Sequence, residues 1–228
     1  MFAKINANSI SPKTGELSTL SREQVFSSKF QYHRGAEIYG EAEPAAFIYQ
    51  VVEGAVRSYK LLSDGRRQIA AFHLTGDIFG LENGSVHRFT AEAIVNTTVW
   101  LLKRQSLEDA AEGDASVTHD LLCLTTKNLQ HAEDHLLLLG RQTAPERVAA
   151  FLCEMDSRLS TSAMMTLPMY RRDIADYLGL SLETVSRALS MLRDRGILSF
   201  KSQTQREIVL LDRSKLAQLA DQPARRDH

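Results

Sequence analysis

Short apolar runs alternate with glycine-containing turns over the first half of the chain. This spacing, about ten residues from turn to turn, is typical of antiparallel strands. It predicts strands at residues 47–52, 55–62, 67–74 and 98–103. Asp64-Gly65 lies between two of these runs and predicts a tight hairpin turn flanked by Leu61 and Arg66. We therefore expect an antiparallel β-roll, or jelly roll, over residues 1–105.

The apolar period changes from strand-like to helical between Leu107 and Leu139. Two stripes follow the predicted helix, and one of them, Val117, Leu121 and Leu124, suits packing against the β-roll. The other has seven-residue spacing and consists of Leu122, Leu129, Ala132, Leu136 and Leu139. We expect residues 106–140 to form a dimerisation helix that packs by this stripe against a second subunit. One broad core face within a monomer is the alternative.

A further helix is predicted after Gly140, because Thr143 can cap it and Pro145 suits its first turn. Residues 141–228 then continue with short helices and one pair of strands on either side of the polar segment 202–206. These residues include 14 basic and 11 acidic side chains, a net charge of +3 that is compatible with a polyanionic partner. The rest of the chain is acidic.

Two amphipathic helices joined by a Gly-containing turn are predicted within residues 170–192. Such a pair is the helix-turn-helix arrangement, whose second helix enters the DNA major groove by its N-terminal turn. The second helix would bury Val185, Ala188, Leu189 and Leu192. Its opposite side carries Glu183, Ser186 and Arg187, which must then face solvent or a partner.

The chemistry of this free face suits base recognition. Arginine can donate two hydrogen bonds to guanine and a carboxylate can accept one from cytosine, each pair discriminating by about 1–3 kcal/mol. Glu183 and Arg187 are also an i,i+4 pair, so a surface salt bridge worth about 0.3–0.5 kcal/mol is the alternative. We favour DNA recognition because the turn, the helix position and the following strands occur together.

Composition excludes several classes of protein. Apolar runs such as residues 136–139 are far shorter than the roughly 20 residues of a membrane span, and residues 1–21 lack the order of a signal peptide. A cytoplasmic location is therefore expected.

Cys123 and Cys153 are the only cysteines, which excludes a four-thiolate metal or iron–sulfur site within one chain. We expect both to be small core residues, with Cys153 as a candidate redox-sensitive thiol.

The histidines do not predict a metal site or an enzyme. His131 and His135 could share a metal ion at i,i+4 spacing, but two ligands do not close a site. His33, His73 and His87 stand singly, unlike the paired histidines of metal-dependent cupin enzymes. We expect no cofactor and no catalytic residue.

Several longer motifs resemble one family. They are E-G-A-V-R at 53–57, G-D-I-F-G at 76–80, G-R-x-T-A-x-E-R-V-A-x-F-L at 140–152 and D-I-A-D-Y-L-G-L-S-L-E-T-V-S-R at 173–187. With them the chain resembles the superfamily of the cyclic-AMP receptor protein and the fumarate–nitrate reduction regulator, and most of all FixK-type regulators of rhizobia. The resemblance implies an α+β homodimeric transcription regulator with a β-roll, a long dimerisation helix and a winged helix-turn-helix.

The resemblance also assigns DNA contacts. Base recognition of TTGA-like half-sites in an inverted repeat falls on Glu183, Ser186 and Arg187. Leu182 occupies a position that is apolar in the FixK-type branch, where it can contact a thymine methyl group. The implied candidates for backbone contacts are Ser181, Thr184, Ser202, Gln203 and Gln205.

The sensing part departs from the better-known relatives. Cyclic-nucleotide binders have a glutamate directly after F-G and Arg-Ser before an alanine, whereas Glu82 and Arg88 are each displaced by one residue, which reverses the face of a strand. Residues 1–28 contain no cysteine for an iron–sulfur cluster.

We therefore expect an activator of anaerobic, microaerobic or nitrogen-fixation genes that needs no effector and contacts RNA polymerase, by resemblance through β-roll loops including residues 83–88. An unrecognised ligand in the β-roll is the alternative. A ligand-binding or interaction module without DNA binding is a third hypothesis.

Overall fold

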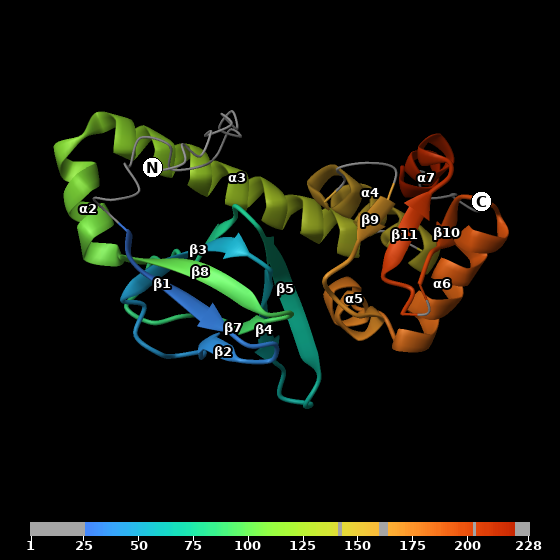
Figure 1. The fold of residues 1–228 in the computed structure, drawn as a ribbon, viewed down its shortest axis with the longest axis horizontal. Coiled ribbons are helices and arrows are strands. Elements are labelled where there is room, and N and C mark those ends of the chain that lie inside the picture. Colours follow the sequence, from blue (N-terminus) through green and yellow to red (C-terminus); the bar gives the residue numbers. More distant parts are fainter. Residues whose placement is uncertain (1–25, 141–142, 160–163, 203, 222–228) are drawn as a thin grey trace, which may run out of the picture.

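Two antiparallel sheets form the N-terminal β-roll (Figure 1). The structure is a computed structural model that describes residues 26–140, 143–159, 164–202 and 204–221. One sheet has the strand order β1-β8-β3-β6 and the other β2-β7-β4-β5. The strands are β1 (Phe26–Tyr32), β2 (Glu37–Tyr39), β3 (Phe47–Glu53), β4 (Ala55–Leu61), β5 (Arg67–Leu74), β6 (Ile78–Phe79), β7 (Thr90–Ala93) and β8 (Thr97–Lys103). The predicted β-roll is confirmed.

The β4–β5 hairpin forms where the sequence predicts it. Leu61 pairs with Arg67, and the backbone amide of Leu62 donates to the carbonyl of Arg66 at 2.8 Å. Gly65 has a φ of 81°, a conformation that costs glycine little and other residues more. Figure 1 shows β5 on the side of the β-roll that faces the C-terminal part of the chain.

Two helices replace the single helix expected over residues 106–140. Helix α2 (Arg104–Gly113) ends before Asp114, and α3 (Ala115–Leu139) begins after it. Asp114 has an extended backbone, and its carboxylate accepts a hydrogen bond from the Ser116 amide at 2.8 Å. An aspartate that caps a new helix in this way favours a break, so the expectation of one continuous helix is wrong.

Helix α3 packs on the β-roll by the predicted first stripe. Val117 and Leu124 are buried and Leu121 is partly buried. They form a cluster with Ile48, Ile78, Leu102 and Leu107 of the β-roll and α2. Figure 1 shows α3 running past the β-roll to the C-terminal part.

The C-terminal part is a winged helix-turn-helix. It contains α4 (Ala144–Leu159), β9 (Met164–Thr166), α5 (Arg171–Leu178), α6 (Leu182–Asp194), β10 (Leu198–Phe200), β11 (Glu207–Leu210) and α7 (Arg213–Ala220). Thr143 and Glu146 cap α4 reciprocally at 3.4 and 3.3 Å. Strand β9 joins the predicted strand pair in a sheet of order β10-β11-β9, and the sequence pattern did not predict it.

One hydrophobic cluster spans both parts of the chain. It includes Ile69 and Phe72 of β5, Leu138 of α3, and buried residues of α4, α5 and α6. The helix-turn-helix is therefore packed against the β-roll rather than only tethered to it. Among the described helices, none is long and apolar enough to cross a membrane.

Candidate nucleic-acid interface

Glycine and serine define the turn between α5 and α6. Gly179 adopts the left-handed conformation with a φ of 63°, and the amide of Leu180 donates to the Ala175 carbonyl at 3.0 Å, as in other glycine-ended helices. Ser181 then caps α6 by accepting a hydrogen bond from the Thr184 amide at 3.2 Å. The three-residue turn and the buried face predicted for α6 are both confirmed: its buried residues are Val185, Ala188, Leu189 and Leu192.

The opposite face of α6 is open. Glu183 and Arg187 are exposed, and Leu182 and Ser186 are half-buried. Among the residues that the structure describes, no ion pair joins Glu183 to Arg187; the guanidinium instead donates to Thr184 Oγ1 at 3.3 Å. Hydrogen bonds from its own amide and from Ser181 lower the pKa of Glu183, so it is ionised at neutral pH. Both charged groups are available to a partner.

The wing is the segment between β10 and β11. Its polar residues contact one another and α5. The hydroxyl groups of Ser202 and Thr204 are 2.9 Å apart, and Gln205 accepts a hydrogen bond from Arg171. This bond links the wing to the start of α5. Gln203, another predicted contact, lies outside the described residues.

The sequence did not predict the basic groove beside Leu182. A cavity of about 280 Å³ lies between α5, α6 and the wing, lined by Leu182 and by Arg171, Arg172 and Arg206. The guanidinium groups of Arg206 and of Arg34 from the β-roll lie 4.8 and 4.7 Å from the centre of the Tyr170 ring. Burial lowers the pKa of Arg171, and the positive charge of Arg193 lowers it further. A bound anion would relieve the repulsion between these two arginines. The Arg-Arg pair directly before Asp173 was the available sequence signal.

Most of the second stripe of α3 is uncovered in the single chain. Leu122, Leu129 and Leu136 are 63%, 58% and 70% exposed, and Ala132 is also exposed. Leu139 differs, because it packs against the core next to Gly179. Leu137 is 69% exposed and was not among the predicted residues.

The cysteines and the His131–His135 pair have separate environments. Cys153 is half-buried on α4 and packs against the core, whereas Cys123 is exposed on α3, so the expectation that both are core residues is wrong for Cys123. His135 stacks on Tyr177 with ring centres 3.9 Å apart. Within the described ranges, no three potential ligands gather into a metal site.

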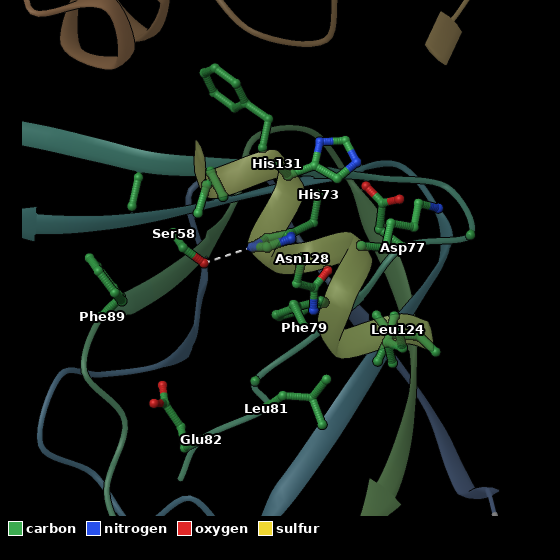
Figure 2. A pocket seen from close by; sticks show the side chains of 18 of the residues that line it. Ser58, His73, Asp77, Phe79, Leu81, Glu82, Phe89, Leu124, Asn128 and His131 are labelled. Carbon is green, nitrogen blue, oxygen red and sulfur yellow. Dashed lines mark hydrogen bonds between the residues drawn. The ribbon is translucent and has the colours of Figure 1, made fainter. Parts of the chain in front are cut away.

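A cavity of about 310 Å³ lies between the β-roll and α3 (Figure 2). His73, Asp77, Asn128 and His131 are among its lining residues. His73 is half-buried and its ring stacks on Phe79; its Nε2 lies 2.8 Å from Ser58 Oγ, and burial lowers its pKa to about 4. The ring is therefore neutral at physiological pH.

Glu82 and Arg88, which are each displaced by one residue from the cyclic-nucleotide-binding pattern, form an ion pair. Arg88 Nε lies 3.2 Å from Glu82 Oε2, and the Arg88 amide donates to Glu82 Oε1 at 3.1 Å. The Glu82 side chain is only 7% exposed. Both residues lie in the loop between β6 and β7 and line the same cavity, so the expected reversal of a strand face is wrong. The Glu82 carboxylate is instead held by a partner within its own loop.

Comparison with known proteins places this geometry in a family. Residues 146–219 match the Crp-like helix-turn-helix domain, and residues 29–114 match the cyclic nucleotide-binding domain. The nitrogen fixation regulation protein FixK of Rhizobium meliloti (strain 1021) is 45% identical over 75% of this chain and 77% of its own length. The fumarate and nitrate reduction regulatory protein of Vibrio cholerae is 30% identical over 87% of this chain and 80% of its own. The chain belongs to the CRP/FNR family of transcription regulators.

The solved structures of CRP/FNR proteins include one with high similarity to this chain. FixK2 from Bradyrhizobium japonicum is 61% identical, with a TM-score of 0.82 over 86% of this chain and 98% of that one. As a CRP/FNR protein the chain is a DNA-binding regulator of transcription and not an enzyme. The predicted family and fold class are confirmed.

Proposed function

We propose that the protein binds an inverted repeat of TTGA-type half-sites as a homodimer and activates nitrogen-fixation or microaerobic genes. The observation that carries the proposal is the open N-terminal face of α6, where Glu183 and Arg187 are exposed without pairing to each other. The similarity to FixK, a nitrogen fixation regulation protein, supports the proposed choice of target genes. The RNA polymerase contact would come from β-roll loops including residues 83–88, of which all but His87 are exposed.

Each side chain on this face has a chemical role. Arg187 donates to a guanine, Glu183 accepts from a cytosine amino group, and Leu182 contacts a thymine methyl group. Ser186 supplies a smaller contact. Phosphate contacts would position the protein without selecting sequence; the candidates are Ser181, Thr184, Ser202, Gln205 and the groove arginines Arg171, Arg172 and Arg206.

The dimer would form through α3. Leu122, Leu129 and Leu136 are exposed at seven-residue spacing, the pattern of helices that pack side by side. Ala132 lies on the same stripe, while Leu139 would contribute less because it already packs within its own chain. A second copy of the chain is therefore the proposed occupant of this face.

Regulation without cyclic AMP or an iron–sulfur cluster is the favoured form of the proposal. The ion pair between Glu82 and Arg88 supports it, because these groups would have to separate to bind a nucleotide. The second candidate is control by another small ligand, which the cavity between the β-roll and α3 favours, since its volume lies near the lower end of ligand sites.

Selection of bound sequences from random DNA, with no added effector, tests the proposal. We expect the selected sequences to contain a TTGA-type inverted repeat. In Arg187→Ala, the preference for guanine at the contacted position should be smaller by about 1–3 kcal/mol. Arg193→Ala is the matched control, because Arg193 is exposed near the other end of the same helix and its guanidinium pairs with the adjacent Asp194. Binding that depends on an added metabolite would overturn effector independence, and an unchanged preference in Arg187→Ala would overturn the base contact.

A further inference from the structure

Two arginines of the β-roll bind one buried carboxylate of the helix-turn-helix. Arg57 Nη1 of β4 lies 2.6 Å from Asp173 Oδ1, and Arg67 Nη2 of β5 lies 2.7 Å from the same oxygen. The Asp173 side chain is 4% exposed. Arg57 also pairs with Glu92 of β7 at 2.6 Å. This cluster joins residues more than a hundred positions apart in the sequence.

Arg67 is committed to α5. Its Nε and Nη2 donate to Asp176 Oδ2 at 2.9 and 2.7 Å, in addition to the pair with Asp173. Burial lowers the pKa of Arg67, but the hydrogen bonds and charges of Asp176 and Asp173 raise it to a net value above the usual one. The neighbouring Arg66 provides a contrast, since it is 77% exposed and pairs with Asp64 in its own turn.

Asp173 has a second partner at the start of α5. Its Oδ2 accepts a hydrogen bond from the Tyr170 amide at 3.1 Å, so one carboxylate both caps α5 and binds the β-roll. The N-terminal end of a helix favours a negative charge. Through Asp173, the arginines therefore fix the helix end that lies beside the wing and the basic groove.

The cluster is one of two polar links between the β-roll and the helix-turn-helix. Helix α4 has its own link to the β-roll, because Arg158 pairs with Asp77 and donates to the Phe72 carbonyl at 3.1 Å. Loss of Arg67 would leave this link in place. Buried ion pairs add little net stability compared with apolar packing, but removal of one partner is costly, and in some proteins they select one arrangement.

We propose that Arg57, Arg67 and Asp173 position the helix-turn-helix relative to the β-roll and thereby set the separation at which the dimer accepts two half-sites. The inference rests on the proposed dimeric binding of an inverted repeat. In such a dimer the half-site spacing follows from the distance between the two recognition helices. A helix pair that can tilt on the β-roll would accept neighbouring spacings at a smaller loss of affinity.

The test uses the full-length protein and operators whose spacer is changed by one base pair at a time. For Arg67→Gln we expect unchanged base preference within each half-site. The affinity ratio between the best spacer and its neighbours should fall by about fivefold, the lower end of typical coupling between sites. Arg66→Gln should retain the wild-type ratio, and Arg67→Lys, which keeps the charge, should restore part of it. Asp173→Asn is the second variant, because its amide oxygen can still cap α5.

The outcomes separate this inference from the function on which it rests. If folded Arg67→Gln and Asp173→Asn both keep the wild-type spacing ratio, the positioning role is wrong while dimeric DNA binding stands. If Arg66→Gln broadens the spacing equally, the effect is one of general charge and the inference is also overturned. A wild-type protein that binds no inverted repeat would overturn both proposals.

Discussion

Leu182 is the apolar residue of the proposed DNA-binding face. It is half-buried and lines a groove that also contains Arg171, Arg172 and Arg206. The α6 core residues begin at Val185, so Leu182 does not complete the buried face of its own helix. An apolar side chain among arginines suits a thymine methyl group with phosphates on either side.

Replacement of this leucine should change base choice. Leu182→Arg is expected to weaken the preference for thymine at the contacted position, in favour of guanine, by about 1–3 kcal/mol, because arginine donates to guanine and has no contact for the methyl group. Selection from random DNA measures the shift. Leu182→Met is the control, since it keeps an apolar side chain of similar volume. A thymine preference that survives in Leu182→Arg would contradict the methyl contact.

At the scale of the element, α3 has two faces with different tasks. Val117 and Leu124 pack on the β-roll, while Leu122, Leu129 and Leu136 face away from the chain. Three large apolar side chains in one row on a helix surface are costly to leave in water. Their spacing favours a second helix as the cover.

A charge in this row should separate the subunits. We expect Leu129→Lys to shift the protein toward the monomer, because two lysines would meet at the dimer axis side by side in an apolar contact. Affinity for the inverted repeat should fall with it. Sedimentation velocity measures the state of association, and Gln130→Lys is the control on an exposed neighbour of the same helix. If Leu129→Lys stays dimeric, the interface lies elsewhere.

At the scale of the whole molecule, the β-roll and the helix-turn-helix share a core around Tyr177. This residue of α5 is 5% exposed. Its ring lies 5.0 Å from Phe72 of β5, 3.9 Å from His135 of α3 and 5.8 Å from Phe151 of α4, measured between ring centres. Three elements from different parts of the sequence therefore depend on one side chain.

Truncation of this side chain should weaken both parts together. Tyr177→Ala is expected to lower the free energy of unfolding by about 3–5 kcal/mol, as for other large aromatic residues in a core. Trp100, the single tryptophan, lies in β8 of the β-roll, so its fluorescence reports on the β-roll, whereas the substituted residue lies in α5. We expect its unfolding midpoint to fall in step with helical circular dichroism, and Arg193→Ala to leave both unchanged. A fluorescence midpoint that does not move would show that the two parts unfold independently.

Local patterns in the sequence determined the elements and the face of α6. The strand runs, the β4–β5 turn and the buried residues of α6 were all predictable, because alternation, a glycine turn and helical periodicity involve residues close together in the chain. Local patterns did not predict every element. They missed β1 and the short strands β2, β6, β7 and β9, the short ones because two to four residues carry too little pattern. They also missed the helix break at Asp114, although glycine followed by aspartate is a signal for the end of one helix and the cap of the next.

Tertiary structure alone decided which surfaces meet. Leu139 follows the period of the exposed stripe but packs next to Gly179, while Cys123 is exposed although its type is often buried. The basic groove combines Arg171 with Arg206, and the positioning cluster combines Arg57 and Arg67 with Asp173. The sequence determined the side chains that can recognise DNA, because their exposure follows from one helix. The fold determined how that helix is held, because the charges that hold it come together only when the β-roll and the helix-turn-helix pack against each other.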